Sequence, residues 1–525
     1  MRDHVISVDV GTGSARAGVV SSTGQLLARC EHPITLSRPR DDQGEHSSEE
    51  IWNACCIAVK AALRQAAIAP SAIAAIGFDA TCSLVLRDRQ GEPLYLREDD
   101  GQGYDTIAWL DHRASAEAAE CSELDHPVLL HHGRAMSPEA EIPKLMWLKG
   151  HRPDLWARLG HAFDLADFLT WKATGSTARS LCTLTSKWSF FGHTKPGWQR
   201  DFLADLGLED LIVRANLPEV AVHVGQSIGP LSHSAAEALG LEPGIAVAAG
   251  MVDAYAGALG VLGAADLTNP DSQPIALIGG TSSCLIALNS KPYHGFSLWG
   301  PYFEAIFPDM WLVEAGQSAT GALLNHLLRS HAQGGEPSID NHRRVIQRIG
   351  ELRAQEGASF GHKINILPDF HGNRSPFADP NLTGTISGLT LDASFDGLCR
   401  IYWRACVSIA LGLRQILEGM IVDQHGPTRL HLTGGHVKNP LLVELYRDAT
   451  GCELMVADET DAVLVGTAIN AATAAKLYPN LMTAGAAMAA KGRLAPPAPH
   501  ASVDFERDYR RFLAMQRHRA ELDSL

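Results

Sequence analysis

Two short turns rich in glycine and hydroxyl side chains lie about half the chain apart, and each stands between two strand-like runs. The first turn, GTGS at residues 11–14, joins the β-rich run Val5–Val10 to the run Ala15–Val20. The second turn, GGTSS, occupies residues 279–283. Because the strand–turn–strand pattern recurs although the residues differ, the sequence indicates duplication of one fold rather than an array of short repeats.

The length of 525 residues also favours more than one hydrophobic core. Strand-like runs alternate with helical patterns such as Ser48–Ala67, which is typical of an α/β fold. The run AAIGFDATCSLVL after that helix predicts a strand that breaks at Gly77 and Asp79 and resumes at Ser83. The link GVLGAADLTNPDSQ contains turn-forming residues and separates the two halves. We therefore expect one domain at residues 1–265 and a second at residues 270–525, ending in a charged helix from Asp504 onward.

The charge and cysteine content exclude several classes of function. The net charge is -15 and basic residues are scattered, so the chain has no general affinity for nucleic acid or anionic membranes. The ten cysteines form no CxxC pair, which favours reduced thiols over disulfides or a zinc site. The chain enters a strand-like run at Val5 without a signal-like leader, and its most apolar window, residues 244–265, contains Asp253. We expect a soluble, cytoplasmic protein.

The first turn has the chemistry of a phosphate-binding loop. Glycines let backbone amides approach a phosphate, while Thr12 and Ser14 add hydroxyl donors. Asp9, just before the turn, is suited to hold Mg²⁺ through water. A plain hairpin turn is the alternative, and the second turn of the same kind favours phosphate binding. No Walker-type loop occurs, and Arg16 stands where a dinucleotide fingerprint requires its third glycine.

Asp253 opens a helix of small residues after the strand Ala246–Ala249 and the break at Gly250. As a helix cap it would contribute about 1 kcal/mol of stability. As a general base it would contribute about 10²–10⁴-fold in rate, and the helix N-terminus would favour a neighbouring phosphate. Its place before the second phosphate turn favours the base.

The segment TGGHVKNPL is a third nucleotide-like element. A strand ends at Thr433, Gly434 and Gly435 form a turn, and Asn439 caps a helix that has Pro440 at its first position. Two residues without side chains beside a helix start leave a flat slot for a purine. The alternative is an ordinary strand-to-helix connection.

The stretch GQSIG at residues 225–229 matches the G-x-S-x-G pattern of a hydrolase nucleophile, with Ser227 as the candidate. That device needs a helix directly after the serine, whereas Pro230 and LSHS follow here. The hydrolase alternative is therefore disfavoured. The histidines also lack paired metal-ligand spacing.

Together these segments resemble the FGGY carbohydrate kinases over nearly the whole chain. The motifs are DVGTGSARAG, WLDHRA, GMVDAYAGALG, GGTSSC, GQSATGALL, DPNLTGTISGLTLD and TGGHVKNPL. The resemblance implies two actin-like (ribonuclease H-like) ATPase domains that close on ATP and a sugar across an interdomain cleft. GFDATCSLV and DFHGNRSPFADP make the chain look most like the ribulokinase branch, and within it the D-ribulokinases.

The resemblance also implies roles for individual residues. Asp253 matches the catalytic base, and Asp9 and Asp253 match the carboxylates near the metal. The implied nucleotide-binding residues are Gly11, Thr12, Gly13, Ser14, Arg16, Gly280, Thr281, Ser282, Gly434, Gly435 and Asn439. The implied sugar-binding residues are Asp79, Ala80, Asp111, Lys187, Asp253 and Glu314. A salt bridge is the alternative for Asp111 and Lys187, and His436 departs from the small residue common after the glycine pair.

The expected function is ATP-dependent, Mg²⁺-dependent phosphorylation of a ketopentose, D-ribulose to D-ribulose 5-phosphate. L-Ribulose, xylulose or a pentitol such as ribitol are alternative substrates for the same chemistry. An actin-fold scaffold or sugar sensor that transfers no phosphate is an alternative of another class. The expected partners are a small sugar and ATP, without nucleic acid or membrane, and a homodimer is one alternative for the assembly.

Overall fold

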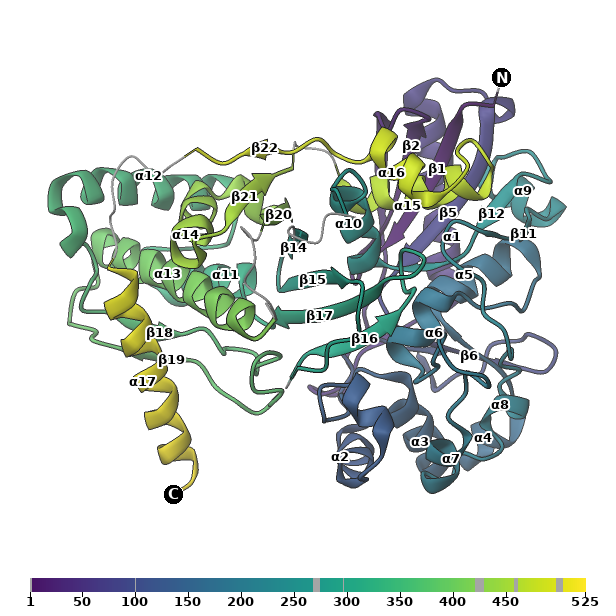
Figure 1. Ribbon diagram of the computed structural model, residues 1–525, viewed down its shortest axis with the longest axis horizontal. Helices are drawn as coiled ribbons and strands as arrows, with labels where there is room; N and C mark the ends of the chain where they lie inside the picture. Colours follow the sequence, from purple (N-terminus) through teal and green to yellow (C-terminus); the bar gives the residue numbers. More distant parts are fainter. Residues whose placement is uncertain are drawn as a thin grey trace.

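The computed structural model describes residues 2–99, 101–267, 274–295, 297–420, 429–457, 461–496 and 504–525. The molecule has two lobes, and each lobe is built on a seven-stranded mixed sheet (Figure 1). Helices cover both sheets, so the expected α/β class is confirmed. No helix in the described ranges is long and apolar enough to cross a membrane.

The two sheets share one topology. In the first lobe the strand order is β11-β12-β5-β1-β2-β3, with β13 beside β5, and in the second lobe it is β16-β17-β15-β14-β20-β21-β22. In each lobe a hairpin, β1–β2 or β14–β15, is followed by a parallel neighbour of its first strand, β5 or β20. The strand order therefore agrees with the predicted duplication.

The strands of the first sheet are β1 (His4–Val10), β2 (Ser14–Ser21), β3 (Leu26–Pro33), β5 (Ile73–Ala80), β11 (Ser227–Pro230), β12 (Ala246–Ala248) and β13 (Met251–Val252). Those of the second are β14 (Pro274–Gly279), β15 (Ser283–Asn289), β16 (Trp299–Phe303), β17 (Trp311–Gln317), β20 (Arg429–Gly434), β21 (Glu453–Val456) and β22 (Arg493–Leu494). The two predicted turns thus lie at equivalent places, at the ends of β1 and β14.

Alternation along β1 decides which side chain reaches the space between the lobes. Successive residues of a strand point to opposite faces of the sheet. Ile6, Val8 and Val10 are buried in the core that they share with helix α1 (Ser48–Ala66). Asp9 consequently lies on the opposite face, where it lines a cavity between the lobes.

Two helices pack against each other between the sheets. They are α10 (Asp253–Leu262) and α15 (Ala462–Ala474), and α15 also packs against β1 and β5 of the first lobe. Their backbones approach so closely that a Cβ at Gly466 would lie 1.8 Å from the carbonyl oxygen of Ala256. The C-terminal part of the chain therefore returns to the first lobe.

The expected boundary between residues 265 and 270 stays a prediction, and residues 268–273 lie outside the described ranges.

Gly77 does not interrupt its strand, although the sequence suggested a break at Gly77 and Asp79. Strand β5 runs unbroken from Ile73 to Ala80. A Cβ at Gly77 would lie 2.9 Å from the carbonyl oxygen of Thr467 in α15. The glycine thus permits the close approach of a helix to the sheet rather than a turn.

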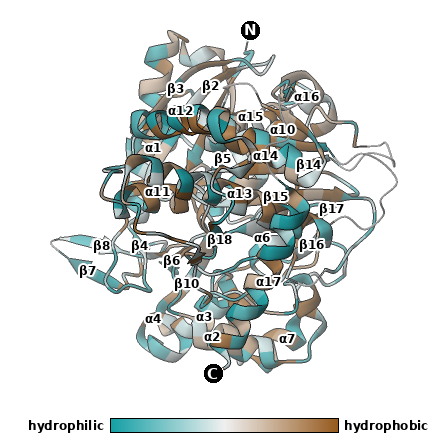
Figure 2. Cartoon of the chain, turned by 90° about the vertical axis from the view of Figure 1, so that its left-hand side faces the viewer, coloured by the Kyte–Doolittle hydropathy of each residue, from teal (hydrophilic) through white to brown (hydrophobic). Residues whose placement is uncertain are grey.

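A smaller four-stranded sheet extends the first lobe, in the order β10-β6-β9-β4. Its strands are β4 (Glu45–His46), β6 (Leu84–Asp88), β9 (Thr106–Ile107) and β10 (Leu159–Asp164), and the hairpin β7 (Arg97–Asp99)–β8 (Gln102–Tyr104) projects beside it (Figure 2). The other helices of this lobe are α2 (Ser115–Glu123), α3 (Glu141–His151), α4 (Pro153–Arg158), α5 (Leu165–Thr174), α6 (Leu181–Lys187), α7 (Arg200–Asp205), α8 (Leu211–Arg214) and α9 (His233–Leu239), with 3₁₀ turns η1 (Pro70–Ala72) and η2 (Pro127–His131).

The core of the second lobe lies between its sheet and a layer of long helices. These are α11 (Gly321–Ser330), α12 (Ile339–Glu356), α13 (Phe395–Met420) and α14 (Pro440–Thr450), with the short strands β18 (Asn365–Leu367) and β19 (Thr385–Ser387) and the turns η3 (Gly357–Ser359) and η4 (Gly435–Lys438). Helix α16 (Leu481–Met488) lies with α15 near the first lobe, and the charged helix α17 (Phe505–Asp523) extends from the second lobe (Figure 1).

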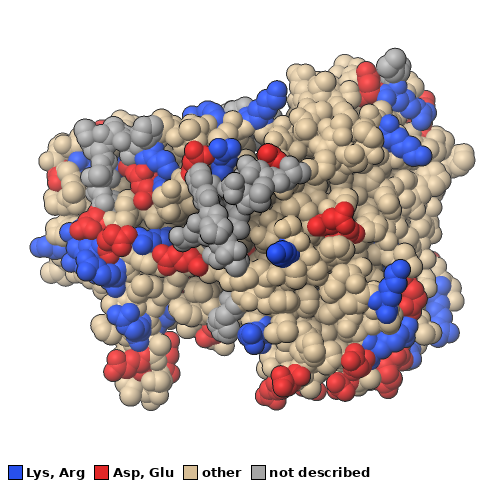
Figure 3. All heavy atoms as spheres, viewed as in Figure 1, with Lys and Arg blue, Asp and Glu red and all other residues tan. Residues whose placement is uncertain are grey.

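Basic and acidic side chains are interspersed on the face that Figure 3 shows. The described residues on this face form no basic stripe. All ten cysteines are described, and none of them forms a disulfide.

Candidate active site

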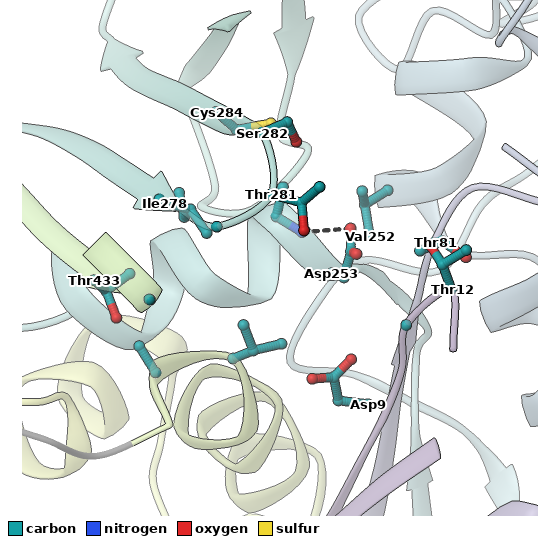
Figure 4. Close-up of a pocket in the computed structure, with 18 of the residues that line it drawn as sticks. Asp9, Thr12, Thr81, Val252, Asp253, Ile278, Thr281, Ser282, Cys284 and Thr433 are labelled. Carbon is teal, nitrogen blue, oxygen red and sulfur yellow. Dashed lines mark hydrogen bonds between the residues drawn. The ribbon is translucent and has the colours of Figure 1, made fainter. Parts of the chain in front are cut away.

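A cavity of about 800 Å³ lies between the lobes, and residues from both lobes line it (Figure 4). The predicted site residues in its lining are Asp9, Gly11, Thr12, Arg16, Lys187, Asp253, Gly280, Thr281, Ser282, Glu314, Gly434 and Gly435. The structure therefore brings both glycine turns, the glycine pair and Asp253 together in one place.

At the first turn, an ion pair joins Asp9 to Arg16. The guanidinium Nη2 lies 2.8 Å from Oδ2 of the fully buried carboxylate, and the Asp79 side chain on the neighbouring strand β5 shares a hydrogen bond with Asp9. Thr12 is fixed differently, because the indole Nε1 of Trp109 donates to its hydroxyl oxygen at 2.9 Å. The turn thus presents a cation and an acidic group to the cavity side by side.

Burial raises the pKa of Asp9 to about 7, the nearby carboxylates of Asp461 and Asp253 act in the same direction, and Arg16 opposes them. A buried carboxylate with a raised pKa is suited to a hard cation, which would restore its charged form. Within the described residues, no group of three or more His, Cys, Asp or Glu side chains is arranged to hold a metal alone. This donor set fits Mg²⁺, which is typically held by one or two carboxylates together with water and substrate phosphates.

Asp253 is the first residue of α10, directly after β13. The N-cap position belongs to Val252, and Oδ1 of Asp253 accepts a hydrogen bond from its neighbour's amide, Ala254 N, at 2.7 Å. Burial raises its pKa, while that amide and Arg16 oppose the shift. The carboxylate points toward Thr281 of the second turn (Figure 4). A buried carboxylate with a raised pKa, aimed at a turn of glycine and hydroxyl side chains, has the properties of a general base.

The second turn is fixed by its own backbone and by α11. The amide of Gly280 donates to the carbonyl of Ser282 at 2.8 Å, and the amide of Gly321, at the start of α11, donates to the carbonyl of Gly280 at 3.1 Å. A Cβ at Gly321 would lie 2.5 Å from that same oxygen. Thr281 and Ser282 are thereby held at the cavity edge (Figure 4).

The glycine pair lies beside the second turn, because Gly434 is the partner of Gly279 in the register of β20 and β14. His436 follows the pair directly in the sequence. His436 Nε2 is 3.0 Å from the carbonyl oxygen of Gly280, and its Nδ1 is 2.9 Å from the hydroxyl of Tyr446. Burial lowers the pKa of His436 to about 4, so the ring is neutral. His436 therefore contacts the backbone of the second turn, and it is not among the residues that line the cavity.

Lys187 and Glu314 both line the cavity. We call the part of the cavity around them the sugar end, after the role predicted for these two residues. Nζ of Lys187, the last residue of α6, lies 4.6 Å from the centre of the Trp299 ring. Burial would lower the pKa of Lys187, but acidic neighbours including Glu314 raise it instead. The hydroxyl of Tyr255 donates to Glu314 Oε2 at 2.9 Å.

Asp111 is not among the residues that line the cavity, and its role as a sugar contact stays a prediction. Its fully buried carboxylate accepts from the amide of Gly44 at 2.7 Å and from Nη2 of Arg113 at 2.7 Å. Arg113 also pairs with Glu45 at 2.9 Å. The salt-bridge alternative is the one that the structure supports.

Several other predicted residues lie near the cavity without lining it. Asp79 is beside Asp9 in the register of β5 and β1, and it accepts a hydrogen bond from Thr467 in α15. Asn439 caps α14 as predicted, with Oδ1 accepting from the amide of Leu441 at 3.1 Å. Ala80, Gly13 and Ser14 likewise belong to neighbouring elements and are absent from the lining.

Sequence reasoning missed part of the lining at the sugar end. Trp109, Cys284 and Arg374 stood inside motifs that had been recognised, but no role was assigned to them. Trp299 and Glu139 carried no motif signal. The missed residues of this end are Thr81, Cys82, Trp109, Glu139, Cys284, Trp299 and Arg374.

Ser227 does not form a nucleophile elbow. It lies in strand β11 at the sheet edge, and its hydroxyl donates to the carbonyls of Gly229 at 3.2 Å and Val247 at 3.3 Å. A hydrolase nucleophile requires a serine exposed on a strand-to-helix turn beside a base. The structure thus gives no support to the hydrolase alternative.

Comparison with known proteins gives consistent matches over almost the whole chain. Family models for the N-terminal and C-terminal domains of the FGGY family of carbohydrate kinases match residues 4–260 and 275–475. An FGGY carbohydrate kinase domain-containing protein of Homo sapiens is 39% identical, covering 99% of this chain and 97% of the relative. A D-ribulokinase of Saccharomyces cerevisiae is 34% identical, covering 90% of this chain and 72% of the relative. The crystal structure of xylulose kinase from Rhodospirillum rubrum shares the fold, with a TM-score of 0.78, 21% identity and 99% of both chains covered.

Proposed function

The chain belongs to the FGGY family of carbohydrate kinases, and we propose that it transfers the γ-phosphate of ATP to a ketopentose, converting D-ribulose to D-ribulose 5-phosphate. The observation that carries this proposal is the single cavity that Asp253 and both phosphate turns line. The D-ribulokinase of Saccharomyces cerevisiae, at 34% identity, supports the choice of sugar.

In this proposal the phosphates of ATP lie between the two turns. Gly11 and Thr12 approach them from the first lobe, Gly280 to Ser282 approach them from the second, and Arg16 adds a positive charge. The adenosine lies against Gly434 and Gly435, where the absence of side chains leaves a flat surface. Phosphoryl transfer relies mainly on positioning and charge stabilisation, which such converging backbone and hydroxyl groups supply.

Asp9 and Asp253 would hold Mg²⁺ together with water and the nucleotide phosphates. The bound cation would neutralise negative charge on the phosphates during transfer. Arg16, which pairs with Asp9, keeps that carboxylate oriented toward the cavity.

Asp253 is the general base. As the primary hydroxyl oxygen of the sugar attacks the γ-phosphorus, its proton passes to the Asp253 carboxylate. The bond from that phosphorus to the β–γ bridging oxygen breaks, and ADP leaves with the electron pair. Burial raises the pKa of Asp253, which brings its basicity closer to the operating pH.

Lys187 and Glu314 hold the sugar. The ammonium donates to sugar oxygens, and the carboxylate, oriented by Tyr255, accepts from sugar hydroxyls. A polyol needs several such fixed donors and acceptors in an otherwise enclosed site. A cytoplasmic location and a homodimer stay predictions.

The experiment that tests the substrate is a comparison of kcat/KM for D-ribulose, L-ribulose, xylulose and ribitol with saturating ATP and Mg²⁺. We expect the highest value for D-ribulose. A higher kcat/KM for xylulose would refute the choice of sugar while leaving the kinase chemistry in place.

A scaffold or sensor that binds nucleotide without transferring phosphate predicts no phosphorylated product from any of these sugars. Nucleotide binding by the wild-type protein, without product from the whole panel, would favour that alternative.

A further inference from the structure

The sugar end of the cavity contains a cation that the mechanism above does not use. Arg374 follows strand β18 in the second lobe, lines the cavity and keeps only 10% of its side chain exposed. Its guanidinium lies between two aromatic side chains, 5.1 Å from the centre of the Trp299 ring and 5.9 Å from that of Trp109. A charge buried this deeply requires polar partners.

The protein supplies only part of those partners. A guanidinium has five N–H donors. Among the described residues, Nη2 of Arg374 lies 3.5 Å from Oε2 of Glu139, and Nη1 donates to the Cys284 sulfur at 3.5 Å. The first contact is longer than the roughly 2.7–2.9 Å of a strong charge-assisted hydrogen bond, and a thiol is a weak acceptor. Donor capacity therefore remains, in a side chain that lines the cavity.

The backbone around Arg374 is fixed before any ligand binds. The hydroxyl of Ser297 donates to the carbonyl of Arg374 at 3.1 Å, and that of Ser375 donates to the carbonyl of Ser297 at 3.0 Å. The Asn373 side chain accepts from the amide of Phe377 at 2.9 Å. This preorganisation lowers the entropy that would be lost when the guanidinium binds a ligand.

Glu139 approaches the same guanidinium from the first lobe, just before helix α3, and is 17% exposed. Burial works against ionisation, but Arg374, together with His112 and Lys187, lowers the pKa of Glu139 to about 2. The carboxylate is therefore charged near neutral pH. The 3.5 Å contact from Glu139 orients the guanidinium of Arg374 and leaves some of the guanidinium N–H donors free for a ligand.

We propose that Arg374 is a sugar-binding residue of this site and that Glu139, across the cleft, positions it. This inference rests on the proposed function and deepens it. The two cations Lys187 and Arg374 are matched by the two carboxylates Glu139 and Glu314. The ligand that fits this equal number of positive and negative side chains is an uncharged polyhydroxy ketose. Its oxygens accept hydrogen bonds from the two cations, and its hydroxyls donate hydrogen bonds to Glu314.

The test compares the wild-type protein with Arg374→Gln, Arg374→Lys, Glu139→Gln and the double variant Arg374→Gln/Glu139→Gln. Arg348→Gln is the matched control, because Arg348 is an arginine of the same lobe that pairs with Asp396 and does not line the cavity. The readouts are KM for D-ribulose, KM for ATP, and the Kd of D-ribulose from calorimetry in the presence of ADP. Thermal unfolding shows which variants are folded.

We expect Arg374→Gln to raise the KM and Kd of D-ribulose about 10- to 150-fold, as for loss of a hydrogen bond to a charged group. Arg374→Lys should give a smaller increase, because it keeps the charge but loses the planar fork. KM for ATP should change by less than about twofold in both, since their effect is confined to the sugar. The double variant should bind D-ribulose no more weakly than Arg374→Gln, because Glu139 acts through Arg374.

A Kd for D-ribulose that is unchanged in folded Arg374→Gln would overturn the inference. If that variant does not fold, an unchanged Kd in Arg374→Lys and Glu139→Gln would do the same. Additive losses in the double variant would overturn the positioning role of Glu139. A wild-type protein that neither binds nor phosphorylates a ketopentose would instead show that the proposed function itself has failed.

Discussion

Gly434 and Gly435 follow each other at the end of β20, but an added methyl group would meet different surroundings at the two positions. Gly434 has a φ of +82°, and its Cβ would lie 2.4 Å from the carbonyl oxygen of Gly279. At Gly435 the only atom of the described residues within 4 Å would be that same oxygen, at 3.7 Å, an ordinary contact. The first glycine is required by the backbone, and the second leaves space in the cavity lining.

We therefore expect Gly435→Ala to fold normally and to raise KM for ATP about tenfold, because the methyl group enters the proposed nucleotide slot. Gly434→Ala should lower both the unfolding temperature and the ATP affinity, since a side chain at this φ is strained. Thermal unfolding and steady-state kinetics check both expectations. Normal ATP affinity in Gly435→Ala would contradict the placement of the adenosine.

Site residues inside a single motif could be predicted from the sequence, because the turn itself fixes their geometry. Asp9, Thr12, Gly280 and Asp253 all line the cavity as expected. The contact between Glu139 and Arg374 could not be predicted in this way. This contact joins two segments that are far apart in the sequence and belong to different lobes. A local sequence pattern carries no information about such a contact.

At the scale of elements, α10 and α15 determine how the two sheets are joined. A Cβ at Gly466 would meet the backbone of Ala256, and one at Gly260 would lie 2.0 Å from the carbonyl oxygen of Ala462. Backbone atoms cannot move aside as the end of a flexible side chain can. Each of these glycines is therefore needed for the helices to be in contact.

Gly466→Ala should destabilise the protein by about 3 kcal/mol or more, because overpacking here has no side chain to displace. Gly350→Ala is the control, since Gly350 lies within α12 and its Cβ would meet no atom of the described parts of the chain within 4 Å. That substitution should stabilise by up to about 1 kcal/mol through helix propensity. Thermal unfolding of the two variants in parallel measures the difference, and equal midpoints would contradict the close contact of the helices.

The turn η2 of the first lobe contacts strand β16 of the second lobe, and the segment before that strand, through a neutral histidine. His131 Nδ1 lies 2.7 Å from the carbonyl oxygen of Pro301, and its ring packs 5.0 Å from that of His294. Burial lowers the pKa of His131 to about 4, and the neighbouring histidines add to the effect. The unfolded chain binds a proton at this residue below a pH of about 6.5, whereas the folded protein does so only near 4. Stability should therefore fall as the pH decreases from 6.5 to 4.

His131→Asn removes this titration and keeps an amide donor for Pro301. We expect the unfolding temperature of this variant to decrease less than that of the wild type between pH 6.5 and 4. An identical pH dependence in the two proteins would show that other groups are responsible.

Elements could be predicted from the sequence where the local pattern was strong. The hairpin β1–β2, the helix after Asn439 and the helix opened by Asp253 all lie within a few residues of their expected positions. Strand β5 was wrongly expected to break, because a glycine that admits a neighbouring helix has the same local pattern as a glycine in a turn. Only the packed structure separates the two.

At the scale of the whole molecule, both lobes contribute to the reaction that we propose. Asp9 and Asp253 come from elements of the first lobe, the second phosphate turn and the glycine pair come from the second lobe, and one cavity joins them. The repeated topology explains why two similar turns face each other. Helix α15 adds a contact between the two halves of the sequence, because it packs against β1 and β5 of the first lobe.

Transfer of labelled γ-phosphate from ATP to D-ribulose, measured for the wild-type protein and Asp253→Asn, tests the central claim most directly. The asparagine keeps an acceptor for the Ala254 amide, so the fold should be retained, as thermal unfolding would show. We predict labelled D-ribulose 5-phosphate from the wild type and a rate about 10²–10⁴-fold lower from the variant. Equal rates from both proteins, or no labelled sugar from the wild type, would contradict the account.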